Sequence, residues 1–565
     1  MRLMGVSTVE FLSIERAAKL TARVKAFESS GVQYKFGSER SPIGGTLDPY
    51  TGSWDTEQAA HLLSRAMLGA TKDQIELVLE IGPEAAVDML FEDKPLPEPP
   101  INYFNEEDPF TPIGETWIDK PFVQELRGGR MASLFAWTMG NMLDEGISIR
   151  ESLTLFWHNH FVTADINLPK AIYQYITLLR ENALGNFKEL TELITVNPSM
   201  LAYLNSSQNT KFAPNENYAR ELLELFTIGK GKLAGPGDYT TFTELDVQQI
   251  ARVLTGWRIR LITDSGEMPE PFFNGFFHDT DDKTLSHRFN EITIQDNGEN
   301  EYLDLINIIF EHKEASRFIC RKLYRWFIYY KIDDNIEQTI IEPMAQILRD
   351  NNFEIKPVLR ALFLSEHFYD VNSLGCIIKN PINFMLALIK QFSIPFPAIP
   401  RQKYGLWNGI YRFIELLQMA YYFPPSVAGW KAFYQEPAYN QLWINSVTLI
   451  IRQLFSDVMA TSGFESFDGR FRIDALAFTA SMDNPLDPNK LIEGFADVIF
   501  PNKLEQDQID ILKGILIPGL PDFEWTVEYQ AYLDNPDDEE VRNGVDGRIR
   551  LLIRAMLARP EYHLS

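Results

Sequence analysis

The stretch Asn215–Gly229, NENYARELLELFTIG, decides the fold class because its apolar residues recur at helical spacing. Asn215 is a typical residue at a helix start, and Gly229 is a typical residue at a helix end. One face of the predicted helix carries the apolar side chains Tyr218, Leu222, Leu225 and Phe226. Similar amphipathic segments with short connections recur along the chain, so the sequence predicts a mainly α protein built as a large, irregular multi-helix assembly.

One region departs from this helical pattern. Residues 260–295 are rich in Asp, Gly, Pro, Asn and Phe, and Asn274-Gly275 stands between two pairs of phenylalanines. An Asn-Gly pair between apolar residues is typical of a hairpin turn. We therefore expect a small β-hairpin or loop insertion near 260–295. We also expect three units: an N-terminal helix and arm (1–52), a main helical domain (53–460) and a C-terminal helical segment (461–565) packed on it.

Charge and composition exclude some classes of function. The 565 residues include 78 acidic and 52 basic ones, which leaves a net charge of −26. Such a surface repels phosphate backbones, so we expect no nucleic-acid partner. No apolar run approaches the ~20 residues that a bilayer requires. No signal peptide is evident, so a cytoplasmic location is expected from the sequence as given.

The chain contains two cysteines, Cys320 and Cys376. We expect two buried, reduced thiols because free cysteine is commonly buried. A single disulfide is the alternative. Two cysteines cannot form a thiolate zinc site without other ligands.

The segment Phe156–Phe161, FWHNHF, holds two of the eight histidines. On a continuous helix His158 and His160 would point roughly 200° apart, so one helix could not present both to the same ion. An extended backbone after Phe156 would let both face the same way. The functional interpretation is a pair of metal ligands or proton carriers. The alternative is a pair of histidines hydrogen-bonded inside an aromatic core.

The helix predicted from Asn215 carries two polar stripes. Glu216 and Arg220 are at ion-pair spacing on one of them. The other places Glu221 and Glu224 close together without an intervening cation, and such oxygen atoms are ligands for hard or borderline cations. The alternative is a solvated acidic face.

A third candidate lies in the loop that follows the predicted hairpin, where His278 and Asp279 precede Asp281, Asp282 and Lys283. Ordered loops on a rigid scaffold commonly carry functional sites. The aspartates could coordinate a cation or form Asx turns, and their spacing matches no EF-hand. The chain also lacks a Gly-x-Ser-x-Gly elbow, a P-loop, a dinucleotide fingerprint and a His-Glu-x-x-His motif.

In their order along the chain, these motifs resemble the bacterial family called domain of unknown function 1800. The resemblance covers about Ala59 to the C-terminus and is carried by Leu63–Ala70, Phe156–Phe161, Asn215–Gly229, Leu254–Trp257, His278–Lys283, Phe423–Trp430 and Trp443–Asn445. It implies a predominantly helical protein without an established activity or known catalytic residues. Members are often exported, which makes a periplasmic or exported location the alternative. Many are encoded beside proteins that look like sulfatases and alkaline phosphatases.

Two hypotheses of function follow. The first is a metal-dependent enzyme that holds iron, manganese or zinc, with Glu221 as general base and Arg220 or Lys283 as the group that binds an anionic substrate. Its candidate ligands are His158, His160, His278, Asp279, Glu216 and Glu224. The second is a non-enzymatic scaffold or binding partner, either of a phosphatase- or sulfatase-like protein or of a surface assembly. A third, weaker alternative is carbohydrate or peptide binding through aromatic-lined grooves. The sequence indicates no particular substrate.

Overall fold

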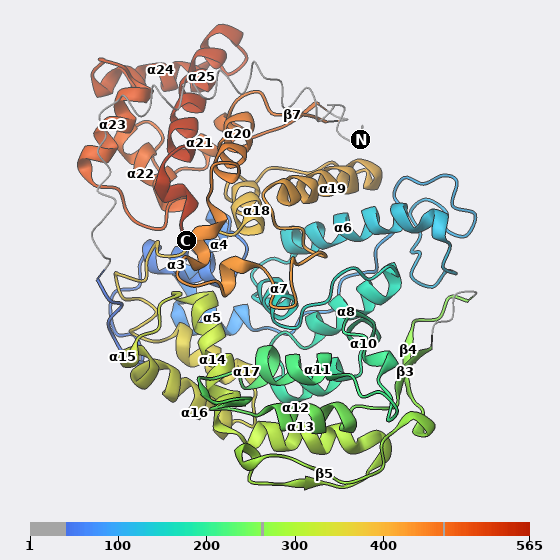
Figure 1. Ribbon diagram of the computed structural model, residues 1–565. Coiled ribbons are helices and arrows are strands. Elements are labelled where there is room, and N and C mark those ends of the chain that lie inside the picture. Colours follow the sequence, from blue (N-terminus) through green and yellow to red (C-terminus); the bar gives the residue numbers. More distant parts are fainter. Residues whose placement is uncertain (1–40, 261–264, 467–468) are drawn as a thin grey trace.

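The computed structural model describes residues 41–260, 265–466 and 469–565 (Figure 1). The helix predicted within the N-terminal unit, over residues 9–27, lies outside these ranges. Helices dominate the described part, and its strands form only two-stranded antiparallel sheets. The predicted fold class, mainly α with a small β insertion, is therefore confirmed.

The first half of the described chain, up to the β insertion, contains a series of helices. They are α3 (Thr56–Ala66), α4 (Lys72–Ile81), α5 (Pro83–Leu90), α6 (Arg127–Asp144), α7 (Arg150–His160), α8 (Pro169–Glu181), α9 (Phe187–Thr195), α10 (Pro198–Tyr203), α11 (Glu216–Glu221) and α12 (Glu244–Val253). A non-helical stretch between α5 and α6 and one short hairpin before α12 interrupt this series. The helix that begins at α11 continues as a π-helical segment, η3 (Leu222–Thr227), and Gly229 follows it at a φ of +72°.

The second half contains the remaining helices. They are α13 (Glu301–Glu311), α14 (Lys313–Phe327), α15 (Asp334–Ile336), the π-helical η7 (Glu337–Ile341), α16 (Glu342–Asp350), α17 (Ile355–Phe363), α18 (Pro381–Gln391), α19 (Pro400–Leu416), α20 (Thr448–Ala460), α21 (Ala475–Ala480), α22 (Pro488–Ile499), α23 (Gln506–Leu516), α24 (Asp522–Asp534) and α25 (Glu539–Leu557). Short 3-10 segments include η4 (Gly275–Phe277), η8 (Lys431–Phe433) and η9 (Tyr439–Trp443). In the described part, no helix is both long enough and apolar enough to cross a membrane.

Four hairpins make up the β structure of the described residues. Their strands pair as β1 (Leu233–Gly235) with β2 (Asp238–Tyr239), β3 (Trp257–Arg260) with β4 (Glu270–Phe273), β5 (Lys283–Thr284) with β6 (Thr293–Ile294), and β7 (Phe464–Ser466) with β8 (Gly469–Phe471). The insertion predicted near 260–295 is present, but Asn274-Gly275 is not its turn. Phe273 pairs back with Trp257, and the Asn274 side chain instead caps η4 by accepting a hydrogen bond from the Phe276 amide.

Local sequence signals account for many helix starts. Thr71 with Gln74, and Thr243 with Asp246, form reciprocal capping boxes that satisfy backbone amides left free at a helix start. The Asn215 side chain accepts a hydrogen bond from the Asn217 amide at the start of α11. These hydrogen bonds join residues two or three positions apart, which is why they can be anticipated from sequence.

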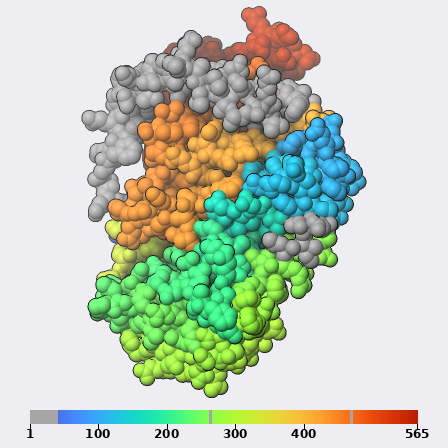
Figure 2. Space-filling model, turned by 45° about the vertical axis from the view of Figure 1, so that its right-hand side comes forward, coloured from blue at the N-terminus to red at the C-terminus, as the bar shows by residue number. Residues whose placement is uncertain are grey.

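Packing between distant helices forms the core. The ring of Phe135 on α6 stacks on Tyr411 of α19 with centroids 4.1 Å apart. The C-terminal helix α25 is tied to α20 by a bidentate ion pair between Arg554 and Asp457. In the ribbon view and in the space-filling view, α12 and α13 lie at one end of the molecule and the C-terminal helices at the other (Figures 1 and 2). Cys320 and Cys376 are buried free thiols, as expected.

Candidate metal centre

His278 is held in place by the hairpin of β3 and β4 and by the turn that precedes β3. Gly256 has a φ of +98°, and a Cβ there would lie 2.9 Å from the Phe273 ring and 3.2 Å from the His278 Cβ. Only glycine adopts this conformation without strain and leaves this space. The Thr255-Gly256-Trp257 motif therefore packs directly against the His278 motif.

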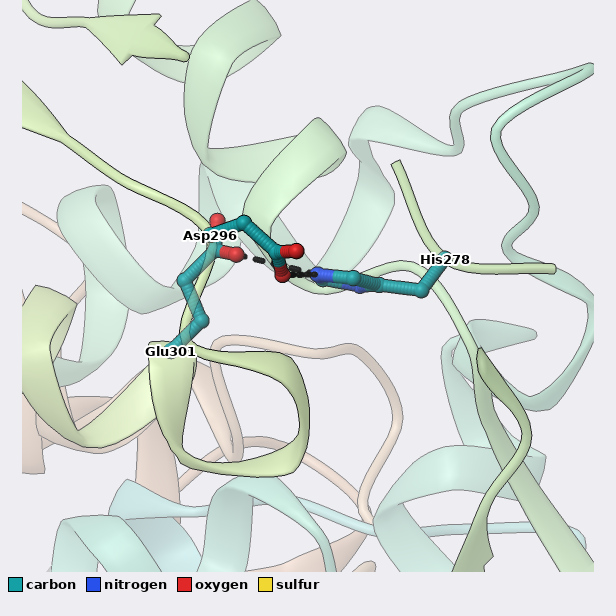
Figure 3. Close-up of side chains that lie close together, drawn as sticks. All are labelled: His278, Asp296 and Glu301. Carbon is teal, nitrogen blue, oxygen red and sulfur yellow. Dashed lines mark hydrogen bonds and ion pairs between the residues drawn. The ribbon is translucent and has the colours of Figure 1, made fainter. Parts of the chain in front are cut away.

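Three acceptor atoms converge at this point (Figure 3). His278 Nε2 lies 2.9 Å from Glu301 Oε2 and 3.5 Å from Asp296 Oδ1. The other ring nitrogen, Nδ1, lies 2.9 Å from the Thr255 carbonyl oxygen, which can only accept, so Nδ1 carries a proton and donates it. In the neutral ring, Nε2 would then present a lone pair to two carboxylates.

The two carboxylates differ in their surroundings. Glu301, the first residue of α13, is fully buried, and its Oε1 lies 2.7 Å from Nζ of the equally buried Lys283 on β5. Lys283 also donates to the Asp279 carbonyl oxygen. Asp296 lies in the loop between β6 and α13, and its side chain is 42% exposed. The site therefore has one open side, at Asp296.

Electrostatics favour a positive charge on or beside the ring of His278. Burial by itself lowers the pKa of His278, but the hydrogen bonds to the Glu301 carboxylate and the Thr255 carbonyl outweigh it and raise the pKa above its ordinary value. Burial also raises the pKa of Asp279, but the Arg252 guanidinium outweighs it and lowers this pKa. Two hydrogen bonds of 2.7 and 3.1 Å join Arg252 to Asp279. The Asp279 carboxylate is thus engaged with Arg252 rather than with His278.

His158 lies in a different environment. Helix α7 runs through both histidines of the FWHNHF motif, and Nε2–H of His158 donates to the Tyr421 carbonyl oxygen at 2.6 Å. The rings of Tyr175, Tyr421, Tyr422 and Trp430 surround it. Burial lowers the pKa of His158 to about 4, so it is neutral at pH 7. Its Nδ1 is buried and has no hydrogen-bond partner among the described residues.

His160 points to another neighbour, as the helical geometry requires. Its Nε2–H donates to the Phe226 carbonyl oxygen at 2.9 Å, and its Nδ1 accepts a hydrogen bond from Lys322 Nζ at 3.0 Å. Burial, together with the nearby lysine, lowers the pKa of His160 well below its ordinary value. Burial lowers the pKa of Lys322 to about 7. These contacts match the structural alternative, a histidine hydrogen-bonded in an aromatic core.

The acidic residues predicted on the helix from Asn215 are also engaged separately. Arg220 bonds Glu216 at 3.1 Å, and it holds Glu244 of α12 with two hydrogen bonds. Glu224 lies 3.2 Å from Lys230. Burial, with Glu224 beside it, raises the pKa of the half-buried Glu221.

The predicted metal ligands do not meet in one cluster. Among the described residues, the one group of three potential ligands whose atoms all lie within 4.8 Å of one another is His278, Asp296 and Glu301. Of the residues singled out from the sequence, the structure brings together His278, Asp279 and Lys283. It places His158, His160, Glu216 and Glu224 in the other contacts described above.

Sequence reasoning missed Asp296 and Glu301. Asp296 lies in a stretch whose acid and glycine are typical of any turn, and its Oδ1 accepts a hydrogen bond from the Gly298 amide at 3.0 Å. Glu301 has the position of an ordinary acidic residue in the first turn of a helix. The one sequence signal for Glu301 was its position at the start of the helix that follows the insertion, 23 residues after His278. A helix start that follows an insertion directly is expected to pack near it.

The fold and site together define a large helical protein with a buried histidine–carboxylate centre beside a β insertion. The family model described as "Protein of unknown function (DUF1800)" matches residues 61–564. The chain therefore belongs to this family, and the resemblance drawn from its motifs is confirmed. Comparisons with curated proteins and with solved structures found no match.

Proposed function

We propose that this protein binds one divalent transition-metal ion through His278, Asp296 and Glu301 and acts as a metal-dependent enzyme. The observation that carries the proposal is the meeting of three acceptor atoms: His278 Nε2, Glu301 Oε2 and Asp296 Oδ1. Acceptors repel one another unless a cation, either a proton or a metal ion, lies among them. The Nδ1–H bond to the Thr255 carbonyl has the form that orients most metal-ligating histidines.

The choice of ion follows from the donor set. One imidazole and two carboxylates suit zinc, manganese or iron, in agreement with the metals named from the sequence. Lys283 neutralises one charge through Glu301 Oε1 and leaves Oε2 available to an ion. Three protein ligands leave at least one coordination position for water or substrate. A metal ion held by these three ligands would polarise a substrate oxygen or activate water bound at its open position.

The alternative occupant of the centre is a proton. A doubly protonated His278 would donate to Glu301 and complete a buried chain from Lys283 through Glu301 to His278. In that case the centre stabilises the β insertion, and the second candidate function, a non-enzymatic binding partner, gains support. Phe523 and Val527, one turn apart on α24, are each 61% exposed and offer an apolar surface for a protein partner, such as one of phosphatase- or sulfatase-like type.

Elemental analysis of untagged protein, purified without chelator, tests the metal proposal. The wild type is compared with His278→Ala and with the matched control His158→Ala, which removes a buried histidine from the aromatic core. We expect near-stoichiometric zinc, manganese or iron in the wild type and the control, and its loss in His278→Ala. No metal in the wild type, and no heat of binding when chelator-treated protein is titrated with these ions, would refute the proposal.

A further inference from the structure

A second site lies where segments far apart in the sequence meet, and none of its residues belongs to the His278 centre. It is a cleft lined by the end of α3, the end of α14, the residues before and at the start of α18, and the segments η8 and η9. Two of the family motifs, Leu63–Ala70 and Trp443–Asn445, contribute side chains to this cleft, and the proposed metal function uses neither of them.

Aromatic rings form much of the wall of this cleft. Trp326 stacks on Phe433 with centroids 4.6 Å apart, and the edge of Trp443 meets Phe433 at 5.6 Å. Tyr330, which also lines the cleft, stacks on Tyr439 with centroids 5.2 Å apart. Such rigid rings offer flat apolar faces at little entropic cost, and the C–H groups of a sugar ring pack well on them.

The cleft also carries polar side chains that can bond to a ligand. Asn440 is a largely buried residue that lines the cleft, and its carboxamide has no hydrogen-bond partner among the described residues. The carboxamide atoms of Asn440 are not among the buried unsatisfied atoms of the described residues, so they are open to the cleft, where a ligand or water can bond to them. The Asn383 side chain adds a second amide to the lining, and the hydroxyls of Ser64 and Ser152 also line the cleft, although they already bond to the His61 carbonyl and the Trp326 ring nitrogen.

Arg325 supplies a positive charge that the described part of the protein leaves without a carboxylate partner. Its Nε donates to the Tyr330 carbonyl oxygen at 3.3 Å, and its guanidinium lies 5.5 Å from the centre of the Tyr439 ring. Its two terminal nitrogens have no hydrogen-bond partner among the described residues. No Asp or Glu side chain of the described chain lines the cleft, although the protein as a whole is strongly acidic. A guanidinium held in this way is suited to bidentate binding of a carboxylate.

We propose that this cleft binds a small saccharide that carries a carboxylate, such as a uronic acid. Arg325 binds the carboxylate, Asn440 bonds to ring hydroxyls, and the aromatic rings pack against the sugar. Arg65 and Lys379 also line the cleft, but they are buried and donate to the Ser373 and Tyr562 carbonyl oxygens. The guanidinium of Arg325 is therefore the group left to match one carboxylate. The proposal goes beyond the metal function and does not depend on it.

Titration with glucuronate and galacturonate, followed by calorimetry and tryptophan fluorescence, tests this proposal on the full chain. Glucose serves as the neutral counterpart. We expect a uronate to bind at least about tenfold more tightly than glucose, because a charged hydrogen bond adds roughly 1.5–3 kcal/mol. Absence of binding by both uronates, or equal binding of glucose, would overturn the proposal.

Two variants and one control locate the site. Arg325→Gln removes the charge and is expected to weaken uronate binding about tenfold or more. Asn440→Asp changes the shape little but places a repelling carboxylate in the cleft, so it is expected to weaken uronate binding more than glucose binding. Arg401→Gln, a substitution in an exposed pair with Glu106, serves as the control and should leave binding unchanged. Melting temperatures identify a misfolded variant, and unchanged binding in either folded cleft variant would contradict the proposal.

Discussion

Two groups of histidines in this protein have opposite chemistry. His158 and His160 lie on α7 within an aromatic core, donate to backbone carbonyls, and stay neutral because burial lowers the pKa of each. His278 is also shielded from solvent, yet its hydrogen bonds to the Glu301 carboxylate and the Thr255 carbonyl raise its pKa. Burial alone therefore does not make a functional histidine. The neighbouring charge decides whether the ring stays neutral or takes up a proton or a metal ion. Each prediction below tests this contrast.

The largest effect is expected from Glu301→Ala. Removing this carboxylate leaves Lys283 buried without its counter-charge, and breaking a buried ion pair costs about 3–5 kcal/mol. Urea unfolding of chelator-treated protein measures the loss. The control is Glu299→Ala, an exposed residue two positions before it, which should change the free energy of unfolding by less than about 0.5 kcal/mol. Equal midpoints for both variants would show that the Lys283–Glu301 pair does not form.

His158→Ala comes next. The substitution opens a cavity among four aromatic rings, and such large-to-small changes in a core cost roughly 2–4 kcal/mol. Its metal content should equal that of the wild type, whereas His278→Ala should lose both stability and metal. A loss of metal in His158→Ala, with the fold intact by circular dichroism, would mean that His158 rather than His278 belongs to the metal centre.

Gly256→Ala is expected to cost about 1–3 kcal/mol, since an L-residue at this positive φ is strained and its Cβ would press on Phe273 and His278. Because His278 would shift, metal affinity should fall together with stability. Gly519→Ala is a useful comparison, because Gly519 also has a positive φ but a Cβ added there would meet no atom within 4 Å. If both variants lose stability but only Gly256→Ala loses affinity, the close contact at His278 is the cause.

The contributions of His278 and His158 to stability should depend on pH in opposite directions when metal is removed by a chelator. The folded-state pKa of His278 is raised, so its contribution to stability is complete below the unfolded pKa of about 6.5 and is lost as pH rises through the folded value. The pKa of His158 is lowered to about 4, so its contribution is present above the unfolded value and is lost as pH falls towards 4.

Unfolding of the wild type, His278→Gln and His158→Gln between pH 4.5 and about 8.5 measures these two contributions. The difference between wild type and His278→Gln should shrink as pH rises. The difference between wild type and His158→Gln should shrink as pH falls. If the two differences changed with pH in the same direction, the contrast between His278 and His158 would be wrong.

The smallest effect on stability is expected from Asp296→Asn. Its side chain is 42% exposed, so the free energy of unfolding should change by less than about 0.5 kcal/mol. Loss of the carboxylate charge from a metal ligand should nevertheless weaken metal binding at least about tenfold, since even outer-shell partners contribute that much. Calorimetric titration of chelator-treated protein with zinc or manganese measures the change. Unchanged affinity would remove Asp296 from the proposed ligand set and leave a proton as the occupant.

The sequence by itself determined the class of fold and the family. Helical periodicity, the caps at Thr71, Asn215 and Thr243, and the order of the motifs depend on residues close together in the chain, so they can be recognised without coordinates. The angle between His158 and His160 followed from helix geometry in the same way, and the structure sends their rings to Tyr421 and Phe226.

Only the tertiary structure decided which charged groups meet. His278, Asp296 and Glu301 come from a loop, a turn and a helix start, and no short spacing connects them. Likewise, Arg220 was a candidate for substrate binding until its contact with Glu244, 24 residues away, was known. Arg325 and Asn440 meet in one cleft from opposite sides of a long stretch of helices. A side chain's charge is written in the sequence, but its partners depend on contacts between segments that only folding brings together.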